Sequence, residues 1–333
     1  MSQPSVLLVC HAGAGIGLGH LSRCLVVAQA LQNAVFWQVN LLIVTNEVIS
    51  EVTHGFNQVV VHRSSDWVRA LLTEQARTKA DLVLLDLYQP DCPGDFAIGL
   101  RLLRARGCRL VGIDGLYGWA DLLHLIYVPS FRIPTGVGAM TVTKVVSGWD
   151  CFLLRVTPAT HAGVSGRRVL VLTGGSDATG LGASWPSQLD GGLPAHAQID
   201  WVCGPFAAEP CWPRPARLAH RVHRAQPNLN GLMSEVNYAV TLYGVSFFEL
   251  LCKGLPVVVF SADGSKDQDD LKEIARLQLA MVARDEAEAT LQIAALMQDA
   301  DRAAQLGSRA RKQLGDVSGK RLVCELQSVL ASA

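Results

Sequence analysis

The feature that most constrains the fold is a regular alternation of short apolar runs with amphipathic segments. The runs SVLLVC (5–10), VNLLIVT (39–45) and DLVLLD (81–86) are apolar almost without interruption. Such runs are typical of parallel strands that helices cover on both faces, because both rows of side chains are then buried. Helical patterns follow in HLSRCLVVAQALQ (20–32) and WVRALLTEQART (67–78). This order of elements predicts an α/β fold built on a parallel sheet.

The alternation stops after residue 114 and resumes at residue 167. Between them, VPSFRIPTGVGAM (128–140) is rich in Pro and Gly, and residues 148–166 lack a clear period. Because domains average about 100 to 200 residues, a chain of 333 residues suggests two of them. We place the boundary near 155–165 and predict domains at 1–158 and 159–333, with a last helix that can cross back to the first domain. Further strands are predicted at 58–62, 109–114, 167–175, 198–204, 221–225, 238–244 and 256–262, and further helices at 96–107, 245–254, 266–280 and in the C-terminal SGKRLVCELQSVLAS.

Composition narrows the class of protein. Lys plus Arg equals Asp plus Glu, at 29 each, which argues against broad electrostatic binding to nucleic acid or an anionic membrane. The nine cysteines are scattered singly and none forms a C-x-x-C pair, so we expect reduced thiols in a cytoplasmic protein. The N-terminus has no basic segment before its short apolar run, and no run reaches the roughly 18 apolar residues of a membrane span. We therefore expect neither a signal peptide nor a membrane span.

The first glycine-rich loop, CHAGAGIGLGHLSRC (10–24), joins a strand to a helix. It is not a dinucleotide fingerprint, because His20 stands where the third glycine of G-x-G-x-x-G should be. It is not a Walker A loop, because no Gly-Lys-Ser/Thr follows. Glycines let the backbone approach a ligand closely, and a helix N-terminus attracts anions. The loop therefore favours a substrate contact at Gly15, Gly17 and Gly19 with His20 as a catalytic residue, and the alternative is a plain turn with a histidine at the helix start.

Two loops in the second half repeat this arrangement. In LTGGSDATG (172–180), a strand runs into Gly174, Gly175 and Ser176, which predicts a second anion-facing turn or an ordinary loop. In TLYGVSFFELLCKG (241–254), a strand ends and a helix begins near residue 246. Backbone N–H groups there can bind a phosphate. The residues concerned are Gly244, Val245 and Ser246, with Glu249 one turn later as a candidate acceptor for ribose hydroxyls.

Two further segments carry candidate ligand contacts. DLYQPD (86–91) presents Asp86, Tyr88 and Asp91 at a strand end, where Tyr88 either orients a sugar or water or simply packs. SADGSKDQDDLKEIA (261–275) follows another strand, and Asp267 and Gln268 either face a sugar or reflect the preference of acids for helix starts. No metal-binding spacing such as H-E-x-x-H and no G-x-S-x-G elbow is present, so we expect no metal and no cofactor.

In order along the chain, GIGLGHLSRCLVVAQAL, DLYQPD with LVGIDG, GWDCFLLR, VLTGGSD, TLYGVSFFELLCKGLPVVV, DQDDLKEIA and DVSGKRLV resemble the nucleotide-sugar enzymes of the GT-B class. The chain is most similar to the UDP-2,4-diacetamido-2,4,6-trideoxy-β-L-altropyranose hydrolase family of pseudaminic acid biosynthesis. It also resembles, more distantly, spore-coat polysaccharide proteins and the N-acetylglucosaminyltransferase that makes lipid II. The resemblance implies two Rossmann-like domains that face a central cleft.

The resemblance also implies residue roles. His20 corresponds to the general base, and Tyr88 to a residue that positions water or sugar. Gly244, Val245 and Ser246 correspond to the diphosphate site, Glu249 to the ribose contact, and Asp267 with Gln268 to the sugar contacts. The hydrolases have a Lys-Tyr pair near GWDCFLLR where this chain has Asp150, Cys151 and Phe152, so the nucleotide half matches more closely than the sugar pocket.

We therefore expect a hydrolase that releases UDP from a UDP-linked amino or deoxy sugar by attack of water at the anomeric carbon. A GT-B glycosyltransferase, in which an acceptor hydroxyl replaces water, is the first alternative. A non-catalytic nucleotide-sugar-binding protein of a polysaccharide pathway is the second. UDP-sugar is the expected partner in each case.

Overall fold

The structure is a computed structural model that describes residues 3–13, 16–46, 55–63, 65–133, 143–156, 166–175, 177, 179–224, 229–262, 267–314 and 317–332. The chain forms two compact units. We call Met1–Arg155 with Asp316–Ala333 the N-terminal domain, and Val156–Gly315 the C-terminal domain. Each is an α/β unit with a parallel sheet, as the alternation of strands and helices predicted.

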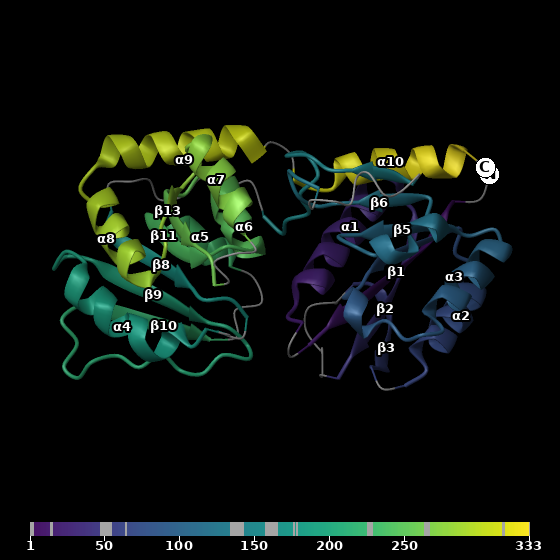
Figure 1. Ribbon diagram of the computed structural model, residues 1–333, viewed down its shortest axis with the longest axis horizontal. Coiled ribbons are helices and arrows are strands. Elements are labelled where there is room, and N and C mark those ends of the chain that lie inside the picture. The colour runs from purple at the N-terminus through teal and green to yellow at the C-terminus, as the bar shows by residue number, and fades with distance from the viewer. Residues whose placement is uncertain are drawn as a thin grey trace. The chain divides into compact units, whose positions relative to one another are not determined.

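The N-terminal sheet has seven parallel strands in the order β3-β2-β1-β4-β5-β6-β7. Figure 1 labels five of them, β3, β2, β1, β5 and β6, in this sequence. The order reverses between β1 and β4, which makes the loops after these two strands the topological switch point, where ligands of such sheets bind. The register pairs Cys10 of β1 with Asp86, the last residue of β4. The strands are β1 (Ser5–Ala12), β2 (Gln38–Thr45), β3 (Asn57–His62), β4 (Leu82–Asp86), β5 (Arg109–Ile113), β6 (Leu125–Tyr127) and β7 (Lys144–Val146).

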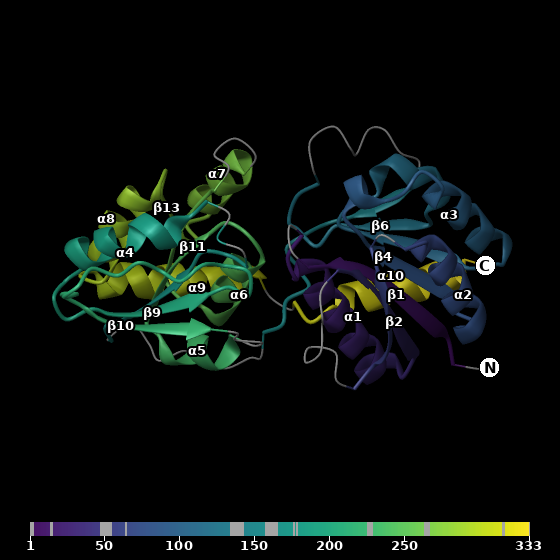
Figure 2. The ribbon, with the colours of Figure 1, turned by 90° about the horizontal axis from the view of Figure 1, so that it is seen from below.

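Helices cover both faces of this sheet. Successive residues of β1 face opposite cores, so that Val6 and Leu8 pack with one and Leu7 and Val9 with the other. The first core is closed by α1 (Gly19–Val35) and α10 (Lys320–Ala331), which lie side by side in Figures 1 and 2. The second is closed by α2 (Trp67–Thr78) and α3 (Phe96–Ala105). Two 3-10 turns, Gln89–Asp91 and Tyr117–Leu122, follow β4 and β5.

The C-terminal sheet has six parallel strands in the order β10-β9-β8-β11-β12-β13, which repeats the topology of the first. Its switch point lies between β8 and β11. The core contains Trp185, Trp201 and Phe260 in edge-to-face contacts. The elements are β8 (Arg168–Leu172), α4 (Leu181–Gly192), β9 (Gln198–Cys203), β10 (Ala219–Arg224), α5 (Asn230–Glu235), β11 (Tyr238–Leu242), α6 (Val245–Lys253), β12 (Val257–Phe260), α7 (Gln268–Arg276), β13 (Met281–Val282), α8 (Glu286–Leu296) and α9 (Ala300–Leu314).

One predicted helix is shorter than expected. The pattern over 266–280 predicted a single helix, but α7 ends at Arg276. Gln278 then adopts a left-handed φ of 54°, and the N–H of Leu279 bonds back to the carbonyl of Ile274. This reversal closes the helix and directs the chain into the edge strand β13, whose two residues are too few to show a period in the sequence.

Candidate functional site

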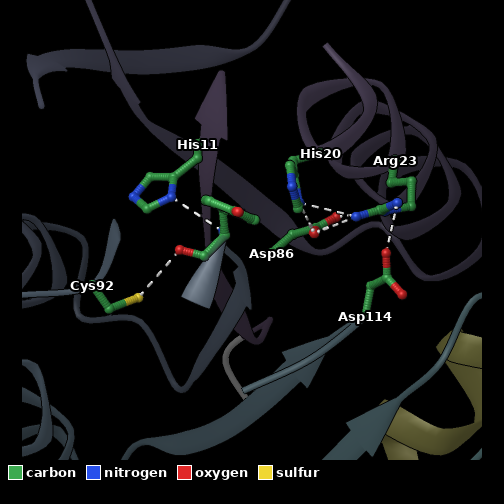
Figure 3. A network of polar contacts seen from close by, with 7 residues as sticks. His11, His20, Arg23, Asp86, Cys92 and Asp114 are labelled. Carbon is green, nitrogen blue, oxygen red and sulfur yellow. Dashed lines mark hydrogen bonds and ion pairs between the residues drawn. The ribbon is translucent and has the colours of Figure 1, made fainter. Parts of the chain in front are cut away.

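The N-terminal switch point brings His20 to Asp86. The loop after β1 leads into α1, which places His20 in the first turn of the helix, while Asp86 ends the neighbouring strand β4. Nδ1 of His20 lies 2.5 Å from Oδ1 of Asp86 (Figure 3). Asp86 is fully buried, and the His20 side chain is 15% exposed, so the carboxylate lies beneath an imidazole at the surface. A buried acid behind a partly exposed histidine is the arrangement that orients a general base.

Arg23 fixes this carboxylate from the other side. It lies one helical turn after His20, and its Nε and Nη2 donate to Oδ2 and Oδ1 of Asp86 at 2.8 and 2.7 Å. Its Nη1 forms an ion pair with Asp114, which follows β5, at 2.9 Å (Figure 3). With neutral His20, the four side chains carry one net negative charge.

The charge states of Asp86 and Arg23 follow from their contacts. Burial alone would raise the pKa of Asp86, but the charge of Arg23 and the hydrogen bonds from Arg23 and His20 outweigh it and hold that pKa below its ordinary value. Burial alone would lower the pKa of Arg23, but Asp86 and Asp114 hold it above its ordinary value. Both groups therefore stay charged at neutral pH.

An ionised Asp86 selects the tautomer of His20. A carboxylate can only accept, so Nδ1 of His20 carries the proton that it donates to Asp86, and Nε2 keeps its lone pair. Nη2 of Arg23 also lies 2.9 Å from Nδ1, because both nitrogens donate to the same oxygen of Asp86. The ring is thereby oriented with a basic nitrogen directed away from the carboxylate.

Tyr88 is held near this cluster through its backbone. Its N–H donates to Nδ1 of His11 at 3.1 Å, and its side chain is 47% exposed. His11 is fully buried and packs edge-on against Trp67, with ring centroids 5.5 Å apart. Burial, followed by the charges of His20 and Arg63, lowers the pKa of His11 to about 4, so its ring is neutral at neutral pH. Within the described residues, no hydrogen bond joins the side chains of Tyr88 and His20, and the catalytic role of Tyr88 stays a prediction.

The glycine loop forms a tight turn at the entrance to α1. Gly13 and Gly17 exchange backbone hydrogen bonds of 3.1 and 2.7 Å, and Gly17 has a left-handed φ of 81°, which favours glycine. Gly15 lies outside the described residues. Gly19 opens α1, and neither a side-chain cap nor an acid of the first turn occupies the N–H groups there. An anion contact at this helix start stays a prediction.

In the C-terminal domain, the start of α6 offers the same feature. Gly244 precedes the helix, no side chain caps it, and its first turn carries no acid. The N–H groups of Val245 and Ser246 are thus not occupied by side chains of the helix. Glu249 lies three residues after Ser246 and is partly exposed, so helical spacing puts it on the same face.

The loop after β8 was predicted to face an anion in the same way, but its helix start is already occupied. Oδ1 and Oδ2 of Asp177 accept the N–H groups of Leu181 and Gly182 at 3.1 and 2.8 Å, so the protein's own carboxylate occupies the start of α4. The carbonyl of Gly175 accepts the N–H of Phe206. A ligand contact at Gly174 and Gly175 stays a prediction that would use their backbone, and Ser176 lies outside the described residues.

Acids at the start of α7 accept hydrogen bonds from side chains of the same domain. Asp267 accepts the hydroxyl of Ser261 at 2.6 Å, and Asp270 accepts the phenol of Tyr243 at 2.8 Å. Two acids, Asp269 and Asp270, lie in the first turn, so this helix start repels an anion. Gln268 is the first residue of α7. Contacts from Asp267 and Gln268 to a neutral sugar stay a prediction.

Arg23 and Asp114 were not singled out from the sequence, and Asp86 was noted only with Tyr88 and Asp91. A usable signal was present, because LVLLD and LVGID both end a buried strand with an acid, and Arg23 follows His20 at the helical spacing of three. Within the described ranges, no group of three His, Cys, Asp or Glu side chains could hold a metal ion. No helix in those ranges is both long and apolar enough to cross a bilayer.

No protein-family model and no curated protein matches the sequence. Solved structures do match along nearly the whole chain. MurG of Acinetobacter baumannii is 16% identical over 98% of this chain and 100% of its own, with a TM-score of 0.64. UGT2 of Phytolacca americana, solved with UDP-2-fluoro-glucose and pterostilbene, is 13% identical over 98% and 100%, with a TM-score of 0.68. The spinosyn forosaminyltransferase SpnP is 16% identical over 99% and 100%, with a TM-score of 0.65. The chain therefore has the two-domain α/β architecture of GT-B glycosyltransferases.

Proposed function

We propose that the protein hydrolyses a UDP-linked sugar, with His20 as the general base. The observation that carries the proposal is the pair formed by His20 and the buried Asp86, clamped by Arg23 at the switch point of a GT-B sheet. One similar structure, UGT2 of Phytolacca americana, was solved with UDP-2-fluoro-glucose, which supports a UDP-sugar as the ligand class. The family resemblance of the sequence favours an amino or deoxy sugar.

The reaction balances as a displacement by water. Nε2 of His20 takes a proton from water as the water oxygen bonds to the anomeric carbon. The bond between that carbon and the phosphate oxygen breaks, and UDP leaves with the electron pair. Asp86 stabilises the imidazolium that forms, because it accepts the Nδ1–H and remains ionised. The products are the free sugar and UDP, and the proton on His20 is returned to solvent.

The nucleotide is assigned to the C-terminal domain. The uncapped start of α6 supports a diphosphate contact at Gly244, Val245 and Ser246, and Glu249 would accept the ribose hydroxyls. The helices α4, α6 and α7 follow the strands β8, β11 and β12. The carboxylate of Asp177 occupies the start of α4, and two acids lie in the first turn of α7. The start of α6 has neither feature. This difference makes α6 the best supported anion site of the domain.

Transfer to an acceptor is the second candidate, and the glycosyltransferases among the similar structures favour it. The same base would then deprotonate an acceptor hydroxyl. A reaction in ¹⁸O-labelled water separates the two. Label in the released sugar and none in UDP supports hydrolysis at the anomeric carbon. Turnover that requires an added acceptor supports transfer. A non-catalytic binding protein would bind UDP and turn over no donor.

The first test is a screen of UDP-linked sugars for UDP release by the wild type and by His20→Ala. Because general base catalysis contributes roughly 10²- to 10⁴-fold, we expect His20→Ala to lose that factor in kcat and to keep its affinity for UDP. His196→Ala is a matched control, since His196 is an exposed histidine before β9. Near-wild-type turnover by His20→Ala would remove His20 from the mechanism.

A further inference from the structure

The C-terminal domain has a second concave feature, which shares no residue with the start of α6. It is a crevice of about 510 Å³ bordered by α7, the edge strand β13, α8 and α9. Figure 1 shows these four elements together. We call it the α9 crevice. Residues that define it are Gln278, Met281, Gln292, Arg302, Leu306 and Arg309.

Two arginines give the crevice a positive wall. Arg302 and Arg309 lie seven residues apart on α9, which places them on one face about 10 Å apart along the axis. Both are exposed, and the structure records no ion pair of either with any residue it describes. A guanidinium that no protein carboxylate neutralises can bind a carboxylate or phosphate through two parallel hydrogen bonds. This wall therefore suits an anion.

Gln292 adds an unsatisfied acceptor. Its Nε2 donates to the carbonyl of Val282 and to Oε1 of Glu288, both at 3.1 Å. These bonds fix the position of the side-chain amide. That oxygen is buried and has no hydrogen-bond partner among the described residues. Because buried acceptors are nearly always paired, a ligand with an N–H or O–H group would complete this one.

The rest of the wall is apolar. Met281 and Val282 of β13 and Leu306 of α9 also line the crevice. A bare inorganic anion would leave this surface wet, whereas an organic anion would cover it. The volume falls in the range of small-molecule sites, about 300 to 1,000 Å³.

We propose that the α9 crevice binds a small organic dianion that has a short carbon skeleton and a hydrogen-bond donor. Arg302 and Arg309 hold the acidic groups, Met281 and Leu306 contact the carbon skeleton, and Gln292 accepts the donor. Dicarboxylates and phosphate monoesters share this chemistry. The site is independent of the proposed UDP site, since it uses other residues and needs no turnover.

Calorimetric titration of the full chain tests the proposal, with 2-hydroxyglutarate and glycerol 3-phosphate as the two organic probes and inorganic phosphate as the bare anion. We expect saturable one-to-one binding of at least one organic probe, at least tenfold tighter than inorganic phosphate. Binding of one probe alone identifies the class as dicarboxylate or phosphate ester, and binding of both supports the shared chemistry. Absence of saturable binding by both probes, or equal affinity for inorganic phosphate, overturns it.

Variants locate the binding. Arg302→Ala/Arg309→Ala should weaken the organic probe roughly 10- to 100-fold, the factor expected for lost charge-assisted hydrogen bonds. Arg69→Ala/Arg101→Ala removes two exposed arginines from α2 and α3 and should change the affinity less than twofold. Unequal effects of the two pairs support the site, and equal effects overturn it.

A second pair of variants adds a negative charge without loss of side-chain volume. Gln305→Glu puts a carboxylate into the lining between the two arginines and should weaken the organic probe at least tenfold. Gln327→Glu makes the same change at an exposed position of α10 in the N-terminal domain and should leave binding within twofold. Because both positions are exposed, neither change should unfold the protein. Retained affinity in Gln305→Glu would also overturn the proposal.

Discussion

The side chain of Asp86 fixes the orientation of two other side chains, His20 and Arg23. It receives one hydrogen bond from His20 and two from Arg23, and none of these partners can accept in return. A carboxylate with three donors and no contact with water is costly to bury unless all three bonds are made. The geometry of the proposed base is thus coupled to the stability of the N-terminal domain.

Asp86→Asn should damage both properties. The amide can accept on one side only, so either His20 loses its orientation or Arg23 keeps an unpaired donor. We expect kcat for UDP release to fall by roughly 10²-fold or more. The free energy of unfolding should fall by about 3–5 kcal/mol, the cost of removing one partner from a buried ion pair. Steady-state kinetics and urea unfolding measure the two effects. Asp121→Asn, at an exposed carboxylate of the same domain, should change neither.

His11 makes stability depend on pH. The unfolded chain takes up a proton near pH 6.5, whereas burial, His20 and Arg63 lower the folded pKa to about 4. Between these values the unfolded state binds more protons, so the free energy of unfolding falls as pH falls from 6.5 to 4. The drop is about 3 kcal/mol, from roughly 1.4 kcal/mol per pKa unit.

His11→Asn should flatten that dependence, because an amide oxygen can still accept the N–H of Tyr88 but does not titrate. Urea unfolding of the wild type and of His11→Asn at pH 7 and pH 4.5 measures this pH dependence of the free energy of unfolding. His196→Asn serves as the matched control and should keep the wild-type slope. If His11→Asn also keeps that slope, His11 is not the group that titrates.

Local sequence patterns predicted some of these site residues and not others. His20 could be found because a glycine loop and a helix start mark it within ten residues. Its partner Asp86 lies 66 positions away and reaches it only through the pairing of β1 with β4. Such a pairing follows from topology and register, which the period of a single strand does not contain. Arg23 looked like one polar residue in an apolar helix, and its role depends on the same pairing.

At the scale of elements, helix starts that look equivalent in sequence differ in what occupies them. The loops after β8 and β11 both follow apolar strands and both carry glycine. Asp177 reaches the N–H groups of α4, but no such residue precedes α6. Glycine content predicted where the backbone can approach a ligand. It could not reveal which of the two starts is already filled.

Ser246→Asp should therefore act oppositely on ligand and helix. A carboxylate in the first turn would stabilise α6 by about 0.3–1 kcal/mol through the helix dipole. The same charge would repel a diphosphate, and we expect the affinity for UDP to fall at least tenfold. Calorimetric titration measures the expected loss of UDP affinity, and urea unfolding measures the expected gain in stability. In Ser184→Asp, the matched change near the start of α4, UDP affinity should stay within twofold. Unchanged affinity in Ser246→Asp would place the diphosphate elsewhere.

At the scale of the whole molecule, the chain folds into two domains and completes the N-terminal one last. Leu322, Val323 and Leu326 of α10 belong to the same core as α1. The segment that leads into α10 also bonds to the N-terminal domain, since the N–H of Leu154 donates to the carbonyl of Val317. The sequence predicted the two α/β domains because each has its own alternation of strands and helices. Which core α10 joins depends on a contact across almost 300 residues.

Leu326→Ala should destabilise the N-terminal domain alone. Leu326 is fully buried, so the lost packing should cost about 2–5 kcal/mol. We expect the calorimetric transition of the N-terminal domain to move to lower temperature, while UDP affinity at α6 is retained. Ser328→Ala, an exposed position of α10, should stay within about 0.5 kcal/mol of the wild type. Loss of UDP affinity in Leu326→Ala would mean that the domains do not unfold separately.

The return of α10 sets an order of events on the ribosome. Synthesis runs from the N-terminus, so all of 156–315 leaves the exit tunnel before α10 does. The first core must wait with its α1 surface uncovered while the second domain is made and can fold. A released chain that ends before residue 320 would thus carry a complete second domain and an unfinished first one, whose exposed leucines and valines are the kind of surface that chaperones bind.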